Sequence, residues 1–344
     1  MNKYLLALVI CPLFACTDFV LPTQDGNFIT GRSMDFSAIF NNLEFHIQPR
    51  GERLTSGTEE QPQAMSWTSS YGYLAIMSQP NMIFDGLNEK GLSTAVLWLS
   101  EGQYPDINFE SPKPILSFLD LPRWILGNFA LVDEVKRAMQ GVQIYAFSLP
   151  LFQGIPPIHL SIHDAEGKSL VIEFLQGQIV VSDNPVGVVT NDPNFAWHLT
   201  NLDNYINLSA KNASSHVLGD LLVQPTGSGS GLLGLPGDWT PPSRFVRTVL
   251  MKYMSQVPKD RSGGIVLTNH LLNAVDLPYG LVRNSAAEPE DYTQWIVIKD
   301  LKNKQVYYRA YNNLNIQKLD LLAQSLHKGA KPQSIQIPLQ EVVP

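Results

Sequence analysis

The sequence predicts an α+β protein in which helices cover packed sheets. Strands are predicted as pairs around short polar turns, at residues 170–175 with 178–182 and at residues 294–298 with 305–311. Apolar residues recur with helical spacing at residues 115–129, 132–139, 243–257 and 264–275. Strands that are apolar on both faces need cover on both sides, and amphipathic helices provide it. We therefore expect sheets in the middle of the molecule and helices outside.

Length and composition bound the class of protein. The chain has 344 residues, 44% hydrophobic and 16% charged, with a formal net charge of −7 and a pI of about 5.5. The apolar fraction is sufficient for a packed core and unlike that of a disordered chain. An acidic balance argues against a nucleic-acid partner, because neutralising phosphates requires a basic face. Two cysteines exclude a disulfide-rich scaffold and a cysteine-rich zinc module.

The first 15 residues read as a signal peptide. Lys3 supplies the basic start, and residues 4–15 are apolar apart from Pro12. The run is shorter than the roughly 20 residues of a membrane span, and a buried first strand is the alternative. Cleavage after the small residue Ala15 would make Cys16 the first residue of an exported chain, periplasmic or secreted. Residues 16–344 are then expected to form a single domain.

The same junction can also be read as a lipobox. Residues 13–16 are Leu-Phe-Ala-Cys, and lipidation of Cys16 would give a lipid-anchored, non-catalytic binding protein. A lipoprotein usually continues with a polar tether. Here residues 18–21 and 27–30 read instead as two strands around the turn at 22–26. A folded hairpin directly after the cysteine favours a buried catalytic N-terminus with no membrane contact after processing.

An N-terminal cysteine can act as both nucleophile and base. The thiolate is the reactive form, and an α-amino group with a reference pKa of about 7.7–8.0 can accept the thiol proton at neutral pH. A carboxylate is needed to hold the amine and a cation to favour the thiolate. Arg32 and Asp35 supply both on the far arm of the predicted hairpin. From spacing alone, an exposed ion pair on a surface hairpin is the preferred interpretation of these two residues.

Five segments of the chain together resemble one enzyme family. They are Cys16-Thr17 with Gly31-Arg32-Ser33-Met34-Asp35, residues 85–92 with Asn-Glu-Lys-Gly-Leu, residues 184–193 with Thr-Asn-Asp-Pro, residues 235–245 with Pro-Gly-Asp and Ser-Arg-Phe, and Thr293-Gln294-Trp295. In this order, over residues 16–311, they resemble the choloylglycine hydrolase family, which includes conjugated bile salt hydrolases and penicillin V acylases. Each segment alone would be a weak signal, whereas the ordered set is specific.

The resemblance implies a fold and a set of roles. The fold is the four-layer αββα N-terminal-nucleophile (Ntn) hydrolase fold, often assembled as a homotetramer. Cys16 would be the nucleophile and, through its α-amine, the base. Asp35 would hold that amine, and Arg32 would lower the pKa of the thiol. Asn191 would donate a hydrogen bond to the oxyanion, and Arg244 would link the charged groups of the site.

Two of these residues have ordinary structural explanations when they are considered without the resemblance. Asn191 precedes Pro193 and could be a turn residue, as in many Asn-x-Pro segments. Arg244 follows a Pro-Pro-Ser helix start and could be a surface cation.

Trp98 marks a departure from the bile salt hydrolases, many of which carry an asparagine at the corresponding position. The backbone N–H at this position can still donate to the oxyanion, but an aromatic side chain replaces the amide side chain. Tryptophan there resembles the penicillin V acylase-like branch of Gram-negative bacteria, some of whose members cleave N-acyl homoserine lactones. Trp98 could therefore line a substrate site, or it could be a core residue of a buried strand.

Other motifs give no competing site. Residues 229–234 match G-x-G-x-x-G but neither follow a strand nor open a helix, so we expect a loop rather than a nucleotide site. His159 and His163 have no glutamate beside them, and no G-x-S-x-G occurs. Residues 224–242 look like a linker and residues 328–344 look loosely ordered. We expect an amidohydrolase with a small-molecule amide substrate and no cofactor or metal, preferring penicillin V or acyl homoserine lactone amides to conjugated bile salts.

Overall fold

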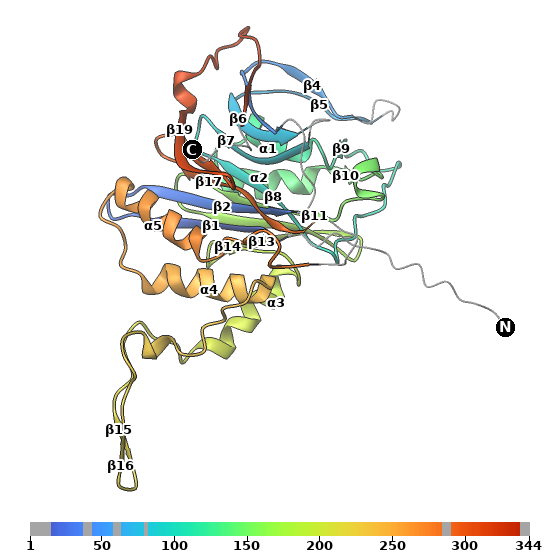
Figure 1. Cartoon of the computed structure of the whole chain (residues 1–344). Coiled ribbons are helices and arrows are strands. Elements are labelled where there is room, and N and C mark those ends of the chain that lie inside the picture. Colours follow the sequence, from blue (N-terminus) through green and yellow to red (C-terminus); the bar gives the residue numbers. More distant parts are fainter. Residues whose placement is uncertain (1–14, 37–42, 58–62, 79–81, 284–289, 338–344) are drawn as a thin grey trace, which may run out of the picture.

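Two large sheets stacked face to face form the middle of the molecule (Figure 1). The structure is a computed structural model that describes residues 15–36, 43–57, 63–78, 82–283 and 290–337. Helices cover the outer face of each sheet, so the four layers run helix, sheet, sheet, helix. The predicted αββα fold is therefore confirmed.

The six-stranded sheet carries the N-terminal end of the described chain. Its strands, in spatial order, are β14 (Val188–Val189), β1 (Thr17–Pro22), β2 (Phe28–Phe36), β17 (Tyr292–Asp300), β18 (Gln305–Ala310) and β19 (Asn313–Asp320). β1 and β2 pair antiparallel from Thr17 opposite Ser33 to Pro22 opposite Phe28, which confirms the predicted hairpin. Gly26, with φ of +74°, closes the turn between them, a conformation that glycine adopts without steric cost.

The eight-stranded sheet carries the rest of the central layer. Its strands, in spatial order, are β13 (Gln178–Asp183), β12 (Ser169–Leu175), β11 (Ile158–His163), β8 (Ser93–Trp98), β7 (Met82–Asn88), β6 (Tyr73–Ser78), β3 (Glu44–Gln48) and β20 (Gln333–Gln336). β7 and β8 pair only where residues 85–87 oppose residues 93–95. Beyond that short ladder the two strands no longer pair, and this is where the site lies.

The helices divide between the two outer faces. Those over the six-stranded sheet are α3 (Phe195–Asn201), α4 (Pro241–Met254) and α5 (Arg261–Asn273), and those over the eight-stranded sheet are α1 (Leu121–Asn128) and α2 (Val132–Ala138). One apolar cluster lies between the sheets and reaches α4 and α5, while a second lies between the eight-stranded sheet and α1. Burial of both sheet faces explains why these strands are apolar on both sides.

The prediction of one helix over residues 115–129 is wrong. Residues Ile115–Ser117 form strand β9, which pairs in parallel with β10 (Gln143–Tyr145), and α1 begins only at Leu121. Pro122 explains the late start, because proline fits the first turn of a helix but not its interior. The apolar spacing of the segment is the same in either structure, so periodicity did not distinguish them.

Two segments in the C-terminal half of the chain also differ from their predicted structure. Residues 224–242, predicted as a linker, include the 3₁₀ turn η4 (Ser230–Leu232), which contains part of the G-x-G-x-x-G match. Within residues 328–344, predicted as loosely ordered, β20 pairs with β3 through Gln333 opposite Ile47 to Gln336 opposite Glu44. Residues 338–344 lie outside the described part of the chain.

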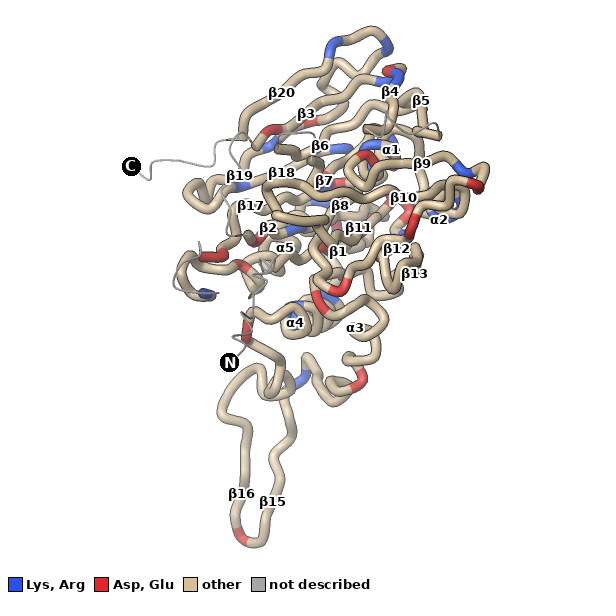
Figure 2. The backbone as a smooth tube through the Cα atoms, turned by 90° about the vertical axis from the view of Figure 1, so that its right-hand side faces the viewer, with Lys and Arg blue, Asp and Glu red and all other residues tan. Residues whose placement is uncertain are grey.

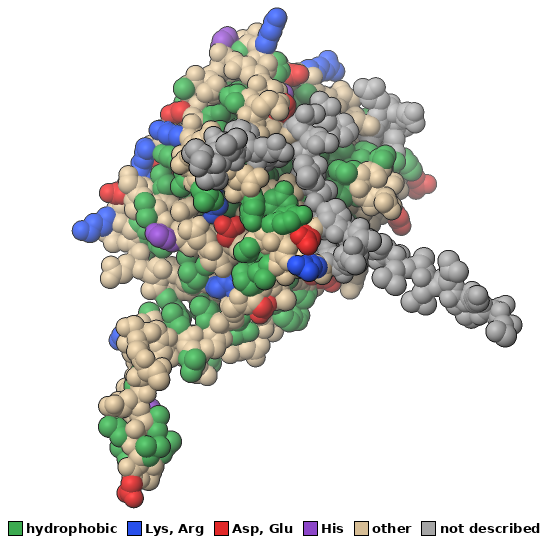
Figure 3. All heavy atoms as spheres, in the orientation of Figure 1, with side chains coloured by type: hydrophobic (Ala, Val, Ile, Leu, Met, Phe, Trp, Pro, Cys, Tyr) green, Lys and Arg blue, Asp and Glu red, His purple; other side chains and the backbone are tan. Residues whose placement is uncertain are grey.

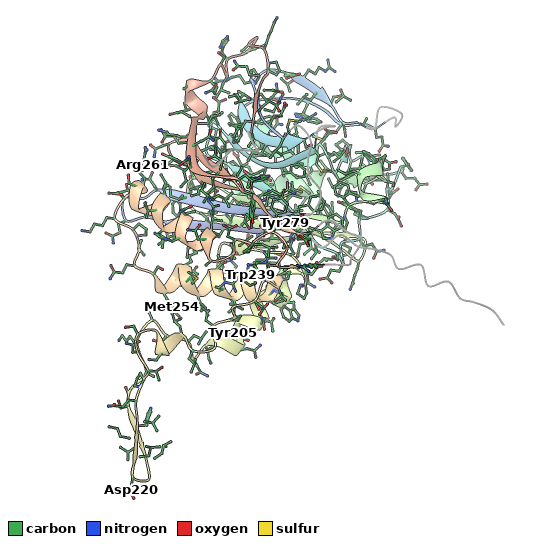
Figure 4. All side chains as sticks on the ribbon, in the orientation of Figure 1. Tyr205, Asp220, Trp239, Met254, Arg261 and Tyr279 are labelled. Atoms are coloured by element: carbon green, nitrogen blue, oxygen red, sulfur yellow. The ribbon has the colours of Figure 1, made fainter. Side chains whose placement is uncertain are left out.

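A hairpin that the sequence analysis missed projects from the body of the molecule (Figures 1 and 3). It consists of β15 (His216–Leu218) and β16 (Leu221–Val223), with Asp220 at its tip (Figure 4). Its exposed apolar side chains are Val217, Leu218, Leu221, Leu222 and Val223, of which Val217 is 67% exposed. Apart from the acidic residue at the tip, the hairpin carries no charged side chain (Figure 2).

Short elements complete the described chain. They are the hairpin β4 (Arg53–Thr55) with β5 (Ser66–Thr68) and the 3₁₀ turns η1 (Met139–Gly141), η2 (Pro150–Phe152), η3 (Leu202–Tyr205) and η5 (Leu321–Ala323). Among the residues described, no helix combines the length and apolar character needed to cross a membrane.

Candidate active site

Cys16 lies directly before β1, with only 1% of its surface exposed. Its Sγ is 3.6 Å from Met34 Sδ and 3.7 Å from Nη2 of Arg32, both on the neighbouring strand β2. Burial raises the pKa of the Cys16 thiol, and the guanidinium of Arg32 acts in the opposite direction. Activation of this sulfur therefore requires a base as well as the nearby cation.

Arg32 reaches from one sheet into the other. Its fully buried guanidinium donates hydrogen bonds to Phe84 O on β7 and to Val96 O on β8, the latter at 2.5 Å. These carbonyls lie just beyond the short ladder between the two strands. Arg32 therefore bridges β7 and β8 by side-chain hydrogen bonds at the point where their ladder ends.

The separated strands line a cavity that has Cys16 among its lining residues. The remaining lining residues are apolar: Met34, Met82, Ile83, Phe84, Val96, Leu97, Trp98, Phe118, Leu119, Pro122, Phe152, Pro156 and Ile158. Small-molecule sites are usually apolar with a few polar groups at the reacting end. Here the polar groups lie on the other side of the sulfur.

Arg244, in the first turn of α4, gathers three groups around Cys16. Its Nη1 donates to Cys16 O at 2.5 Å and to Thr17 Oγ1 at 2.7 Å, and its Nη2 donates to Asn191 Oδ1 at 2.9 Å. Asn191 Nδ2 in turn donates to Trp98 O at 2.9 Å. Both side chains are fully buried. Arg244 is therefore a central residue of the site rather than a surface cation, and Asn191 has a fixed amide orientation.

Asp35 also lies on β2, the strand that pairs with β1. Its carboxylate accepts hydrogen bonds from Thr293 Oγ1 at 2.5 Å and from Ser33 Oγ at 3.2 Å. Burial raises the pKa of Asp35 to about 7, against the opposing charge of Arg244. The N–H of Ala15 donates to the backbone oxygen of Asp35 at 3.2 Å, so the bond between Ala15 and Cys16 lies beside this residue.

Trp98 is buried in β8 and also lines the cavity. It is therefore a core residue of a strand and is also placed to line a substrate site. Its ring packs against Phe152 with centroids 5.9 Å apart, and its Nε1 donates to Ser100 Oγ at 3.2 Å. Asp192 accepts from both the N–H and the hydroxyl of Ser100, at 2.6 and 2.9 Å. The indole is thereby held in one orientation by the loop that also carries Asn191.

His198 supports Asn191 from α3, a contact that the sequence analysis did not anticipate. Its ring stacks on Phe245 with centroids 4.6 Å apart, and its Nε2 lies 2.9 Å from Asn191 O. Burial lowers the pKa of His198 to about 4, so the ring is neutral at pH 7. A carbonyl oxygen can only accept, so Nε2 carries the proton.

The structure thus brings together Cys16, Arg32, Asn191 and Arg244, with Asp35 adjacent and Trp98 on the cavity wall. The two histidines of β11 lie elsewhere: His163 Nε2 is 2.7 Å from Asp18, and His159 is 3.8 Å from Glu173. No group of three or more potential metal-ligating side chains occurs among the described residues.

Comparison with known proteins decides the family. The profile of linear amide C–N hydrolases, choloylglycine hydrolase family, matches residues 16–336. The chain belongs to this family. A bile salt hydrolase/transferase of Clostridium perfringens is 34% identical over 321 residues, covering 90% of this chain and 94% of that protein. A penicillin V acylase of Pectobacterium atrosepticum is 29% identical over 331 residues, covering 89% and 81%.

Solved structures agree with the family and the fold. A variant of the conjugated bile acid hydrolase from Clostridium perfringens superposes with a TM-score of 0.84 and 30% identity, covering 96% of this chain and 99% of that one. Penicillin V acylase from Agrobacterium tumefaciens superposes with a TM-score of 0.76 and 26% identity, covering 93% and 91%. The protein is therefore an amide hydrolase with the Ntn-hydrolase fold.

Proposed function

We propose that the protein is an exported amidohydrolase whose nucleophile is Cys16 after residues 1–15 are removed. The observation that carries the proposal is the position of the Cys16 sulfur, in the wall of an apolar cavity and 3.7 Å from a buried guanidinium. While Ala15 is attached, the nitrogen of Cys16 is an amide and cannot act as a base. Cleavage at this bond would create the amine that the buried thiol needs.

The proposed reaction has two steps. The α-amine takes the thiol proton, the thiolate attacks the amide carbon, and the C–N bond breaks as the proton passes to the leaving amine. Water then attacks the resulting thioester and gives its proton to the α-amine, which releases the carboxylic acid and the free thiol. The second N–H of Asn191 Nδ2 would stabilise the oxyanion in each step.

The charges around Cys16 fit this sequence of proton transfers. In the mature enzyme the α-ammonium would lie beside Asp35, and a neighbouring cation lowers the pKa of a carboxyl group. Thr293 and Ser33 already orient the Asp35 carboxylate. The family profile begins at Cys16, which supports removal of residues 1–15. Apart from Ala15, the proposed signal peptide lies outside the described residues.

The cavity favours an acyl group without hydroxyls. A phenoxyacetyl group or a fatty acyl chain can fill it by apolar contact alone, and Trp98, Phe84 and Phe152 offer aromatic surface. The steroid of a conjugated bile salt would bring hydroxyl groups against a lining that provides no polar side chain apart from the sulfur. Penicillin V and N-acyl homoserine lactones are therefore the proposed substrates ahead of bile salts.

A panel of phenoxyacetyl amides, acyl homoserine lactones, and glycine- and taurine-conjugated bile salts tests the proposal. We expect kcat/KM to be at least about tenfold higher for the first two classes, because one unpaired buried hydroxyl costs about 1–3 kcal/mol. Cys16→Ala should abolish turnover. The matched control Cys11→Ala changes a residue that cleavage removes and should leave the mature enzyme unchanged. Turnover by the Cys16→Ala protein at the wild-type rate would overturn the nucleophile assignment.

Intact mass of the exported protein tests the processing. We expect a mass that begins at Cys16 and carries no lipid. Burial of the sulfur supports this expectation, since a diacylglyceryl group on Cys16 would have to be accommodated where only 1% of the residue is exposed. A lipidated Cys16 would show that the chain is a membrane-anchored protein instead.

We further propose that the enzyme is a homo-oligomer assembled through the β15–β16 hairpin. A two-stranded hairpin is marginally stable on its own, and this one exposes five apolar side chains without a core to pack on. A second copy of the chain would cover them. Leu221→Asp with Leu222→Asp should convert the oligomer, a tetramer by family resemblance, to monomers in light scattering. A wild-type protein that is already monomeric would refute this part of the proposal.

A further inference from the structure

A row of buried charged side chains lies between the two sheets, behind the site. It runs from Arg32 through Asp85 and Lys299 to Asp18 and His163. Every member is at most 1% exposed in its side chain. Charges buried this completely are costly unless they are paired. The hydrolytic mechanism described above uses only Arg32.

Asp85 and Lys299 form the closest pair of the row. Lys299 Nζ on β17 donates to both carboxylate oxygens of Asp85 on β7, at 2.6 and 2.7 Å. The same carboxylate lies 3.7 Å from Nη1 of Arg32. The guanidinium of Arg32 is thus equally distant, at 3.7 Å, from the Asp85 carboxylate and from the Cys16 sulfur.

The row continues beyond Lys299 with the opposite sign. Asp18 on β1 lies 2.7 Å from His163 Nε2 on β11, and its pKa, which burial would raise, is held low by His163 and also by the charge of Lys299. Lys299 therefore stabilises the charged form of two carboxylates, Asp85 by direct contact and Asp18 by a longer-range Coulombic interaction. Positive and negative groups alternate from Arg32 through Asp85 and Lys299 to Asp18.

The alternation has a consequence for Arg32. If Asp85 had no partner but Arg32, the two charges would cancel, and the guanidinium would favour the thiolate of Cys16 less. Because Lys299 already compensates Asp85 at close range, Arg32 keeps its positive charge available to the sulfur. The carboxylate still holds one side of the guanidinium in place.

We propose that Asp85 and Lys299 are positioning residues that set how much positive charge Arg32 presents to Cys16. The inference rests on the proposed role of Cys16 as nucleophile. Neither residue lines the cavity, and the Arg32 guanidinium lies between the Asp85 carboxylate and the Cys16 sulfur, 3.7 Å from each.

Other titratable and charged groups act on Cys16 or on the groups coupled to it, and they must stay constant in a test. They come from each packed element: Asp18 on β1, Arg32 and Asp35 on β2, Asp85 on β7, His163 on β11, Arg244 on α4, Asp276 after α5 and Lys299 on β17. Removing Asp85 and Lys299 together leaves the net charge of this set unchanged.

The pH dependence of Cys16 alkylation by iodoacetamide tests the inference directly. The experiment uses exported protein whose N-terminus has been verified as Cys16. Lys299→Met should raise the midpoint of the rate profile by about one pH unit, and Asp85→Asn should lower it, as expected for buried charges that interact through an effective dielectric constant of about 20. The double variant, which removes both charges, should return the midpoint to within about 0.3 units of wild type.

Controls separate charge from structure. Lys302→Met removes an exposed lysine just after β17 and should leave the midpoint unchanged, and Lys299→Arg should retain it. Should Lys299→Met fail to fold, Asp85→Asn and the double variant still decide the question. A purely structural role predicts slower alkylation with an unmoved midpoint in both single variants, and that result would overturn the inference.

The test also distinguishes this inference from the proposed function. If alkylation of wild-type Cys16 leaves amide turnover intact, the proposed function fails. If alkylation abolishes turnover but the variants show the wild-type midpoint, only the role of Asp85 and Lys299 fails.

Discussion

The two sides of the Cys16 sulfur differ sharply in chemistry. On one side lies a cavity whose other lining residues are all apolar. On the other side Arg32 and Arg244 bring buried cations and a dense set of hydrogen bonds. The contrast implies a division of labour, in which the cavity binds the acyl group by burial and the charged side stabilises developing negative charge. Substitutions on the two sides should therefore change different kinetic constants.

The largest effect is expected on the charged side. Asn191→Ala removes an amide that is fixed by Arg244 and Trp98 and should lower kcat by about 10²–10³-fold with little change in KM, as for other oxyanion donors. The matched control is Asn194→Ala in the same loop, which removes the N-cap of α3 and should cost about 1 kcal/mol of stability without a change in kcat. A rise in KM with unchanged kcat for Asn191→Ala would place this residue with the cavity instead.

A smaller effect of the opposite kind is expected in the cavity. Phe152→Ala removes a ring that packs on Trp98 and should raise KM for a phenoxyacetyl amide by about tenfold, the equivalent of about 1.4 kcal/mol of apolar burial, with kcat nearly constant. Phe109→Ala, at a phenylalanine that is 57% exposed, is the control. Steady-state kinetics of both variants would contradict the division if Phe152→Ala lowered kcat alone.

A third effect concerns stability at acid pH rather than catalysis. The folded-state pKa of His198 is about 4, below the ordinary value of 6.5, so the unfolded chain binds a proton first as the pH falls. The free energy of unfolding should therefore decrease from about pH 6.5 towards pH 4, by roughly 3 kcal/mol from this group. His198→Gln keeps a donor for Asn191 O but does not titrate, so it should flatten this part of the profile. Equal slopes for the two proteins in urea titrations at several pH values would show that His198 is not responsible.

The proposed catalytic residues could be named from the sequence because the chemistry proposed for them restricts their residue types. Cys16, Arg32 and Asp35 lie on one predicted hairpin, so a local pattern places them together. Asn191 and Arg244 could be connected to them only through the family resemblance, because their contact with Cys16 depends on how α4 packs on the six-stranded sheet.

The cavity and the charge row were not predictable in the same way. Asp85 belongs to one of the five family-like segments, and Lys299 follows a predicted strand. Nothing in the sequence indicates that the packing of two sheets brings Lys299 Nζ to 2.6 Å from the Asp85 carboxylate. Phe84 on β7 and Phe152 in η2 are 68 positions apart in the chain, and only the tertiary fold brings both to the cavity. The β15–β16 hairpin does have a sequence signal, because two short apolar runs flank the turn residues Gly219 and Asp220.

The bridge that Arg32 makes between Phe84 O and Val96 O carries a consequence for selectivity. One guanidinium spans the gap between two strands, so its size sets the spacing of the cavity walls at the reacting sulfur. A lysine at this position has a single ammonium and cannot act as the same spacer. In the proposed reaction, the width of the acyl group that fits the cavity and the reactivity of the Cys16 thiol are thus coupled through one side chain, and a substitution of Arg32 is expected to change both.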